Sequence, residues 1–509
     1  MTALEQARHQ LAAIADLASA LSVLHWDQAT HLPERAFASR GYQLATLTET
    51  LHEKRTDPEF GRLLERCQRD LEDCDPESDD VRLVRVARRD FERAQCIPSE
   101  FAARLSAHQS ASYKTWIRAR PENDFSSLVP VLERTLEFSR ELASFYTGFS
   151  HIADPLIDRA DVGMTVERLR PLFSELRGML APMLRQIAEC PKPDLSAMRG
   201  NFDEDAQIAF GRKIIERMGY DFARGRQDRT HHPFTTRFSG DDVRITTRVR
   251  TDDLAEALFS TIHEAGHALY ELGVAPELDR GPLGSGVSAG VHESQSRLWE
   301  NLVCRSREFW NHHFAELQAA FPQLESVDPE AFYRAINRVE PTLIRTDADE
   351  VTYNLHVIIR FDLELALLEG SLAICDLPQA WNERYHTDLG VAPETDTDGV
   401  MQDVHWYAGV IGGQFQCYAL GNVLSAQLFA AANSASPEIA TETASGRFGT
   451  LRGWLRDNVH RHGRKLEVDP LIERATGAPL RIDAYRDYLH AKFGDLYSID
   501  RWQVPVSDG

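Results

Sequence analysis

Through most of the chain, apolar residues recur every three or four positions with polar residues between them, a pattern that predicts amphipathic α-helices. Residues 126–148 show it well, because their leucines and valines fall on one helical stripe. The chain has no low-complexity linker and no repeat with a period of roughly 20–50 residues. We therefore predict an all-α (mainly helical) fold for residues 1–509 as a single domain, with an N-terminal lobe over 1–200 and a second lobe over 201–509.

One segment, residues 232–250, departs from the helical pattern. It is rich in β-branched residues around a Ser-Gly-Asp turn, which predicts a β-hairpin. In its second strand, Asp242, Arg244 and Thr246 share one face, and the intervening apolar residues share the other. We expect the apolar face to pack on the protein, which leaves the Asp-Arg-Thr face free for another role.

Composition and charge exclude several classes of function. Hydrophobic residues make up 43% and charged residues 26% of the chain, the balance of a folded protein, and the net charge is −22. Such acidity does not suit binding to nucleic acid or to an anionic membrane, and no segment approaches the ~20 apolar residues of a membrane span. The seven cysteines are scattered without a CxxC pair, and the N-terminus lacks the pattern of a secretory signal. These features predict a cytoplasmic protein with reduced thiols.

The strongest chemical signal is a His-Glu-x-x-His sequence formed by His263, Glu264 and His267. The surrounding pattern is helical, and histidines four apart project from one face of a helix, about 5–6 Å apart. Two neutral imidazoles can therefore hold one zinc ion, and Glu264 can act on a water beside it. A second helical segment carries His292 and Glu293, which are 25 and 26 positions after His267, and offers either of them as a third ligand.

Three further segments accompany these motifs. Residues 242–246 read DxRxT, residues 344–349 read IRxxAD, and residues 399–406 read GxxQDxHW. Together with HEAGH and HESQSR, they resemble the motifs of the carboxypeptidase Taq family, in the order of that family. The similarity extends over essentially the whole chain, including residues 25–30 (HWDQAT) and 460–464 (HRHGR).

The resemblance implies a mainly helical fold whose two lobes enclose a deep substrate groove around an HExxH zincin core. It also implies one divalent metal per chain, Zn²⁺ or else Co²⁺, held by His263, His267 and Glu293, with His292 supporting a ligand or the substrate. The implied activity is hydrolysis of the C-terminal peptide bond of peptides with broad specificity, generally without release of proline. Family members usually form homodimers, so we expect a homodimer. Within each chain, we expect the second lobe, residues 201–509, to be the catalytic one.

Three residues are candidates for the chemical steps. Glu264 is expected to take the proton of the attacking water and to pass it to the leaving amine. Tyr418 or His405 is expected to donate a hydrogen bond to the oxyanion of the tetrahedral intermediate. One departure from the family lies beside them, because Gln414 stands where a tyrosine is usual, and the preference at that subsite is expected to differ.

Two arginines are candidates for binding the carboxylate at the end of the substrate, since a guanidinium matches a carboxylate with two parallel hydrogen bonds. Arg244 has Asp242 and Thr246 beside it on the predicted strand, and Arg345 precedes a predicted helix start. The alternative is that both arginines are structural and pair with Asp242 and Asp349.

Two other functions stay open from the sequence. A helical zinc oligopeptidase that cuts internal bonds of short peptides would share HExxH and a following glutamate helix, although the DxRxT and IRxxAD segments argue against it. A helical interaction protein with a structural metal site is the second alternative. Glu264 argues against that one, because a purely structural site does not require a general base.

Overall fold

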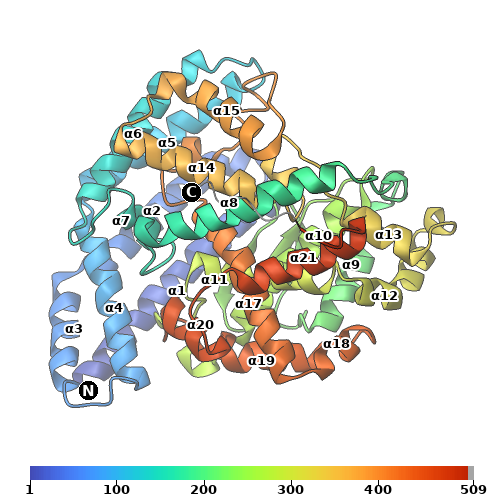
Figure 1. Cartoon of the computed structure of the whole chain (residues 1–509). Coiled ribbons are helices and arrows are strands. Elements are labelled where there is room, and N and C mark those ends of the chain that lie inside the picture. Colours follow the sequence, from blue (N-terminus) through green and yellow to red (C-terminus); the bar gives the residue numbers. More distant parts are fainter. Residues whose placement is uncertain (503–509) are drawn as a thin grey trace.

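The computed structural model describes residues 1–502 and confirms the mainly helical prediction. Figure 1 shows the chain as a body of packed helices with one small sheet. Two satellite helices, α3 and α4, pack beside α1 and α2 at its edge. The bounds of these N-terminal helices are α1 (Ala3–Thr30), α2 (Phe37–Thr56), α3 (Pro58–Asp70) and α4 (Asp79–Cys96).

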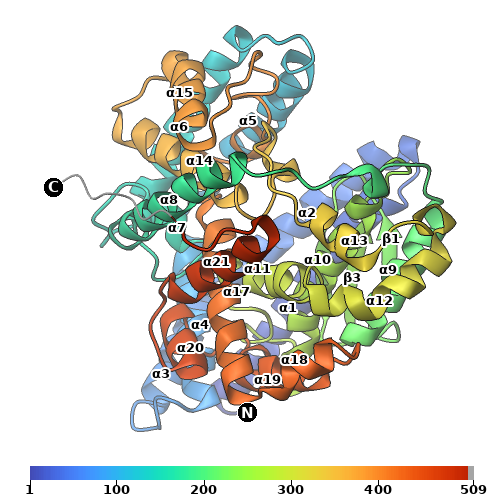
Figure 2. The same ribbon diagram turned by 45° about the vertical axis from the view of Figure 1, so that its right-hand side comes forward.

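A second group of helices gathers at the top of Figures 1 and 2, where α14 packs against α6, α8 and α15, and α16 packs against α5 and α6. This group joins segments that are more than 200 residues apart in the sequence. Its helices are α5 (Ser99–Ala119), α6 (Val129–Ser144), α7 (Asp154–Asp158), α8 (Val166–Ala188), α14 (Tyr353–Glu369), α15 (Leu377–Leu389) and α16 (His405–Ala408).

The remaining helices surround α10 and α17. Figure 2 shows α9, α10, α12 and α13 together with the sheet on the right, α18 and α19 below them, and α20 and α21 to their left. Their bounds are α9 (Glu204–Met218), α10 (Leu254–Gly273), α11 (Ala289–Arg297), α12 (Arg307–Ala320), α13 (Pro329–Ile336), α17 (Gln416–Ala435), α18 (Glu438–Thr443), α19 (Gly449–Asn458), α20 (Val468–Thr476) and α21 (Asp483–Tyr497). The division into lobes at residue 200 stays a prediction.

The sheet has the order β1-β3-β2 and lies against α10. Its strands are β1 (Gln227–Arg229), β2 (Thr235–Ser239) and β3 (Asp242–Thr247). The antiparallel pair β2–β3 is the predicted hairpin, with Thr235 opposite Ile245. Strand β1 pairs parallel to β3 and was not expected, because three polar residues carry no strand pattern.

The face of β3 that we expected to be free is partly covered: Asp242 and Arg244 are half-buried, and Thr246 is buried. Thr246 is fully buried, and its hydroxyl accepts a hydrogen bond from the backbone N–H of Phe234 at 2.8 Å. The same hydroxyl donates to the carbonyl oxygen of Phe234 at 3.2 Å. Thr246 therefore fixes the segment that leads into β2, and the prediction of an available Thr246 is corrected.

Two glycines allow α10, α11 and α17 to approach closely. A Cβ on Gly266 of α10 would lie 2.7 Å from the Cα of Ser296 in α11, and a Cβ on Gly421 of α17 would lie 2.6 Å from the Cβ of Glu293. Any larger residue at either position would push α11 away. These contacts place α11 between the HExxH helix and α17, inside the main apolar core of the protein.

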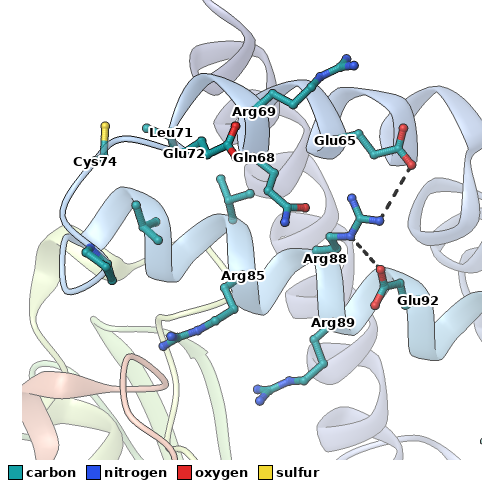
Figure 3. A pocket seen from close by; sticks show the side chains of 13 residues that line it. Glu65, Gln68, Arg69, Leu71, Glu72, Cys74, Arg85, Arg88, Arg89 and Glu92 are labelled. Carbon is teal, nitrogen blue, oxygen red and sulfur yellow. Dashed lines mark hydrogen bonds and ion pairs between the residues drawn. The ribbon is translucent and has the colours of Figure 1, made fainter.

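Two further observations describe the surface. Among residues 1–502, no helix is both long enough and apolar enough to cross a bilayer. A groove of about 770 Å³ lies between α3 and α4 (Figure 3), where Arg88 forms ion pairs with Glu65 at 3.9 Å and Glu92 at 2.7 Å. All of its lining residues come from 65–92, so this groove is separate from the motifs singled out in the sequence.

Candidate metal centre

Helix α10 presents the HExxH residues. The side chain of Asp253 accepts the backbone N–H of Ala255 and so caps the first turn of the helix. The apolar residues of α10 are buried on the sheet and on α9, while the side chains of His263 and His267 keep 19% and 15% of their surface exposed. The two imidazoles thus project from one face of a helix that its neighbours hold rigidly.

Helix α11 presents the glutamate. Ser288 caps it by accepting the backbone N–H of Val291 at 3.1 Å, and the buried carboxylate of Asp161 accepts the N–H of Gly290 at 2.7 Å. Asp161 also accepts a hydrogen bond from the amide of Gln416, at the start of α17, at 3.2 Å. The first turn of α11 is therefore tied to α17, and Glu293 follows directly after it.

The three predicted ligand side chains converge. The Nε2 atoms of His263 and His267 lie 3.6 and 3.4 Å from Oε2 of Glu293, and one ligand atom from each residue lies within 4.8 Å of the others. Tetrahedral ligands at the usual zinc distances of about 2.0–2.1 Å are about 3.4 Å apart. Two imidazole nitrogens and one carboxylate oxygen at this spacing fit a zinc-type divalent cation.

Each histidine is oriented through its second nitrogen. Nδ1 of His263 lies 2.9 Å from Oε2 of Glu300, and Nδ1 of His267 lies 2.6 Å from Nδ1 of His292. Nε2 of His292 in turn lies 2.8 Å from Oε1 of Glu271. Both chains of hydrogen bonds end at a buried carboxylate, so the Nε2 atoms of His263 and His267 are the ones that face Glu293.

Burial and neighbouring charges set the protonation states of the cluster. Burial lowers the pKa of His267 to about 4, which favours the neutral imidazole that a cation requires. Burial alone would raise the pKa of Glu293, but Arg297 and His263 hold it well below its usual value. Burial raises the pKa of Glu264, which brings that carboxyl closer to the range of a general base.

Glu264 has a partner that the sequence did not reveal. The hydroxyl of Thr235, at the start of β2, lies 2.6 Å from Oε2 of Glu264 and 2.9 Å from the Glu264 carbonyl oxygen. Thr235 belongs to residues 232–236 (HPFTT), at the start of the predicted hairpin segment, and the sequence predicted no role for it. The hairpin therefore serves the site through β2, because it delivers a hydroxyl to the carboxylate of the HExxH glutamate.

Tyr418, His405 and Arg345 form a second cluster next to the ligands. Nε2 of His405 lies 3.3 Å from the hydroxyl of Tyr418, and the guanidinium of Arg345 lies 5.2 Å from the centre of the Tyr418 ring. Arg345 also donates to the hydroxyl of Tyr353 at 3.1 Å, and Arg297 stacks on the Tyr353 ring at 4.4 Å. Arg297 in turn bonds to Glu293 at 2.7 Å, so a chain of side-chain contacts through Tyr353 and Arg297 connects this cluster to one of the predicted ligands.

Arg345 does not pair with Asp349, so that predicted partner is wrong, but Arg345 is paired with another carboxylate. Its guanidinium donates to both carboxylate oxygens of Asp403, at 2.8 and 3.1 Å, and only 6% of the residue is exposed. Asp349 instead accepts the backbone N–H groups of Val351 and Thr352, just before α14. Asp349 thus stabilises a helix start.

Arg244 lies away from the cluster around Tyr418 and contacts α1. It donates two hydrogen bonds to Asp242, at 2.8 and 2.7 Å, and its guanidinium lies 4.4 Å from the Trp26 ring and 4.8 Å from the Phe238 ring. The pairing with Asp242 is the one that the structural alternative predicted. These contacts are with the sheet and α1, not with the cluster around Tyr418.

Comparison with known proteins identifies this arrangement. The sequence profile of the carboxypeptidase Taq (M32) metallopeptidase family matches residues 6–493. The chain belongs to this family. Thermostable carboxypeptidase 1 of Thermus thermophilus is 40% identical over 491 residues, which cover 94% of this chain and 96% of that protein. Carboxypeptidase 1 of Bacillus subtilis is 34% identical over 486 residues, covering 95% and 96% of the two chains.

Solved structures agree with the family assignment. The M32 carboxypeptidase of Deinococcus radiodurans superposes with a TM-score of 0.96 at 49% identity, covering 98% of this chain and all of that one. The Pyrococcus furiosus carboxypeptidase superposes with a TM-score of 0.93 at 32% identity, covering 97% and 99% of the two chains. The protein is therefore a metal-dependent carboxypeptidase that uses a divalent metal, and the comparisons do not support the oligopeptidase or interaction-protein alternatives.

The unusual residue Gln414 can be placed within this family site. Its side-chain amide donates to the backbone carbonyl oxygens of His405, at 3.3 Å, and of Val410. A Cβ on Gly409 would lie 2.6 Å from Oε1 of Gln414, so the two residues are closely packed. Gln414 therefore fastens the segment that carries His405, and a change in subsite preference stays a prediction.

Proposed function

We propose that the protein removes C-terminal residues from peptides with Zn²⁺, or alternatively Co²⁺, held by His263, His267 and Glu293. The observation that carries this proposal is the spacing of 3.4 and 3.6 Å between the imidazole nitrogens and the Glu293 oxygen, which suits tetrahedral coordination. Three protein ligands leave a coordination position for substrate or water. When bound, such a cation supplies Lewis-acid polarisation of the scissile carbonyl and lowers the pKa of a water.

Glu264 is the proposed general base and then general acid. Its carboxylate takes one proton from the attacking water as the new C–O bond forms, and it gives that proton to the amine nitrogen as the C–N bond breaks. The hydroxyl of Thr235 fixes Oε2 of Glu264 at 2.6 Å, which leaves Oε1 for the water. The raised pKa of Glu264 favours the first transfer, because it makes the carboxylate a stronger base toward the proton of the water.

Tyr418 and His405 are the proposed donors to the oxyanion. Burial raises the pKa of the Tyr418 hydroxyl, so the hydroxyl keeps its proton and remains a donor at neutral pH. His405 lies 3.3 Å from that hydroxyl, so it can orient Tyr418 or donate in its place. A preformed donor in a buried site stabilises developing charge without reorganisation.

Arg345 is the proposed partner of the substrate carboxylate, because it lies beside Tyr418 and its charge is partly balanced by Asp403. Arg244 is the second candidate, with Asp242 and the buried Thr246 holding its strand. We further propose that the substrates are peptides, that specificity is broad but generally spares proline, and that the protein assembles as a homodimer. Light scattering of the purified protein tests the dimer independently of activity.

The proposal is tested by metal analysis of the purified protein together with mass spectrometry of a peptide digest over time. One divalent ion per chain and a ladder of peptides shortened from the C-terminus are expected. A chelator should stop the ladder and added Zn²⁺ should restore it, whereas Glu264→Gln should bind the metal without producing the ladder. Internal fragments, or hydrolysis that survives removal of the metal, would contradict the proposal.

A further inference from the structure

Directly behind the metal-ligand cluster, α11 runs into a wider helical turn. Residues Leu298–Val303 form a π-helix whose six side chains are buried. The backbone N–H of Cys304 bonds to the carbonyl oxygen of Trp299, five residues earlier, which is the spacing of that turn. Such turns are rare in proteins, and those that do occur are often found at functional sites. This one carries Glu300.

Glu300 contacts one proposed ligand and two arginines. Its Oε2 lies 2.9 Å from Nδ1 of His263 and 3.3 Å from Nη1 of Arg297, and its Oε1 lies 3.3 Å from Nη2 of Arg305. Only 11% of its side chain is exposed. A carboxylate this buried is stabilised by its partners, so the position of the Glu300 oxygens is fixed by three other side chains.

The ring of His263 lies between two carboxylates. Glu300 approaches Nδ1, while Oε2 of Glu293 lies 3.6 Å from Nε2. Because an ionised carboxylate only accepts hydrogen bonds, the neutral His263 facing Glu300 carries its proton on Nδ1. The lone pair is then on Nε2, the atom that faces Glu293 and His267.

Arg297 links the two carboxylates. Its Nε lies 2.7 Å from Oε1 of Glu293, and its Nη1 lies 3.3 Å from Oε2 of Glu300. Glu293 therefore uses Oε1 for the arginine, while its Oε2 faces the two histidines and accepts the hydroxyl of Ser296 at 3.1 Å. Two arginines and two glutamates balance in charge, so removal of the Glu300 charge would leave a surplus positive charge beside a divalent cation.

We propose that Glu300 is a positioning residue of the metal centre, which fixes the tautomer and ring orientation of His263 and balances the charge of Arg297 and Arg305. The inference rests on the proposed ligand set His263, His267 and Glu293. It distinguishes the two histidines: His263 is supported directly by a carboxylate, whereas His267 is supported through the imidazole of His292. Loss of such a partner typically lowers metal affinity 10- to 100-fold.

The test measures metal binding without any peptide. The full-length protein is stripped of metal and titrated with Co²⁺ against a competing chelator, with the visible absorption of Co²⁺ as a report on ligand geometry. Glu300→Gln is expected to raise the Kd roughly 10- to 100-fold and to change the absorption spectrum. Glu350→Gln is the matched control, because Glu350 is equally buried and paired at 2.7 Å, but with Lys492 instead of a metal ligand.

Each outcome decides a different point. A Glu300→Gln variant with the wild-type Kd and spectrum would overturn the inference, as would equal losses in Glu300→Gln and Glu350→Gln, which would indicate general loosening of the fold. Failure of the wild type to bind Co²⁺ would instead refute the ligand set. If Glu300→Gln does not fold, Glu300→Asp replaces it: the charge stays between the arginines, the side chain is one methylene too short for His263, and a raised Kd is again expected.

Discussion

The hydroxyl of Thr235 donates a hydrogen bond of 2.6 Å to Oε2 of Glu264, across 29 residues of sequence. A hydrogen bond to a charged group contributes about 1.5–3 kcal/mol, so Thr235→Val is expected to lower kcat/KM roughly 10- to 150-fold. Thr235→Ser keeps the hydroxyl and should stay within a few-fold of wild type. Steady-state kinetics on one peptide with matched metal content check this, and equal activity of the valine and serine variants would exclude the contact from catalysis.

Substitution of the general base should separate metal binding from turnover. Glu264→Gln keeps the size of the side chain and can still accept the hydroxyl of Thr235, but it cannot take a proton. We expect one metal per chain and a fall in kcat of roughly 10²- to 10⁴-fold or more. Metal analysis and kinetics on the same preparation check both parts. Near-normal turnover with the metal bound would remove Glu264 from the mechanism.

The third ligand can be distinguished from its neighbour on α11. Glu293→Ala removes an oxygen that lies 3.4 Å from Nε2 of His267, so stoichiometric metal should be lost on dialysis. His292→Ala removes only the partner of Nδ1 of His267, so the metal should remain but bind roughly 10- to 100-fold more weakly. If Glu293→Ala keeps its metal while His292→Ala loses it, the two roles are exchanged.

The contacts of Glu264 and Glu293 also show how far the sequence alone could lead. The HExxH spacing and the following glutamate predicted three side chains that the helices α10 and α11 do bring together. Helical periodicity predicts the two histidines, because residues four apart on one helix are neighbours whatever the rest of the chain does. Glu293 lies on another helix, and the family resemblance favoured it over His292.

Contacts between distant segments were not predictable in the same way. Thr235 and Glu264 meet only because β2 packs on α10, and Arg345 meets Asp403 across 58 residues, beside Arg360 of α14, which also pairs with Asp403. Strand alternation shows which side chains share a face but not what covers that face. The burial of Thr246 could therefore not be predicted from the sequence. Glu300 lies seven residues after Glu293, a helical spacing that could have drawn attention to it.

A buried glutamate outside the ligand cluster should make stability depend on pH. Glu364 is 1% exposed, and burial raises its pKa from 4.5 to about 7, although the indole N–H of Trp406 donates to it at 2.9 Å. Between pH 4.5 and about 7 the folded state therefore holds a proton that the unfolded state releases. Stability must fall as pH rises through this range, by about 3 kcal/mol in total.

Glu364→Gln removes this dependence, because the amide has no charge to bury and still offers an oxygen to Trp406. Relative to wild type, the variant should become more stable by about 3 kcal/mol on going from pH 4.5 to pH 8. Urea unfolding of both proteins at the two pH values measures the change, with equal metal loading. A stability difference that is the same at both pH values would show that Glu364 titrates normally in the folded protein.

The last prediction concerns how the enzyme recognises the end of its substrate. Arg345 lies beside Tyr418 and donates to Asp403, which is also held by Arg360. Because Arg360 remains, Arg345→Gln leaves Asp403 paired, so the variant is expected to fold. Arg244→Gln tests the second candidate, and Arg248→Gln serves as control, because Arg248 follows the same strand but pairs with Glu256 at 2.6 Å.

Each variant is compared with wild type on one peptide as a free acid and as its C-terminal amide. The amide has no charge for a guanidinium, so wild type should strongly prefer the acid. Loss of a charge-assisted hydrogen bond, worth about 1.5–3 kcal/mol, should lower kcat/KM on the acid roughly 10- to 150-fold and leave the amide almost unchanged. We expect this for Arg345→Gln, since the contacts of Arg345 lie within the cluster of Tyr418, whereas those of Arg244 lie on Trp26. A loss confined to Arg244→Gln would move the carboxylate site to the hairpin, and equal cleavage of acid and amide by wild type would refute charge recognition altogether.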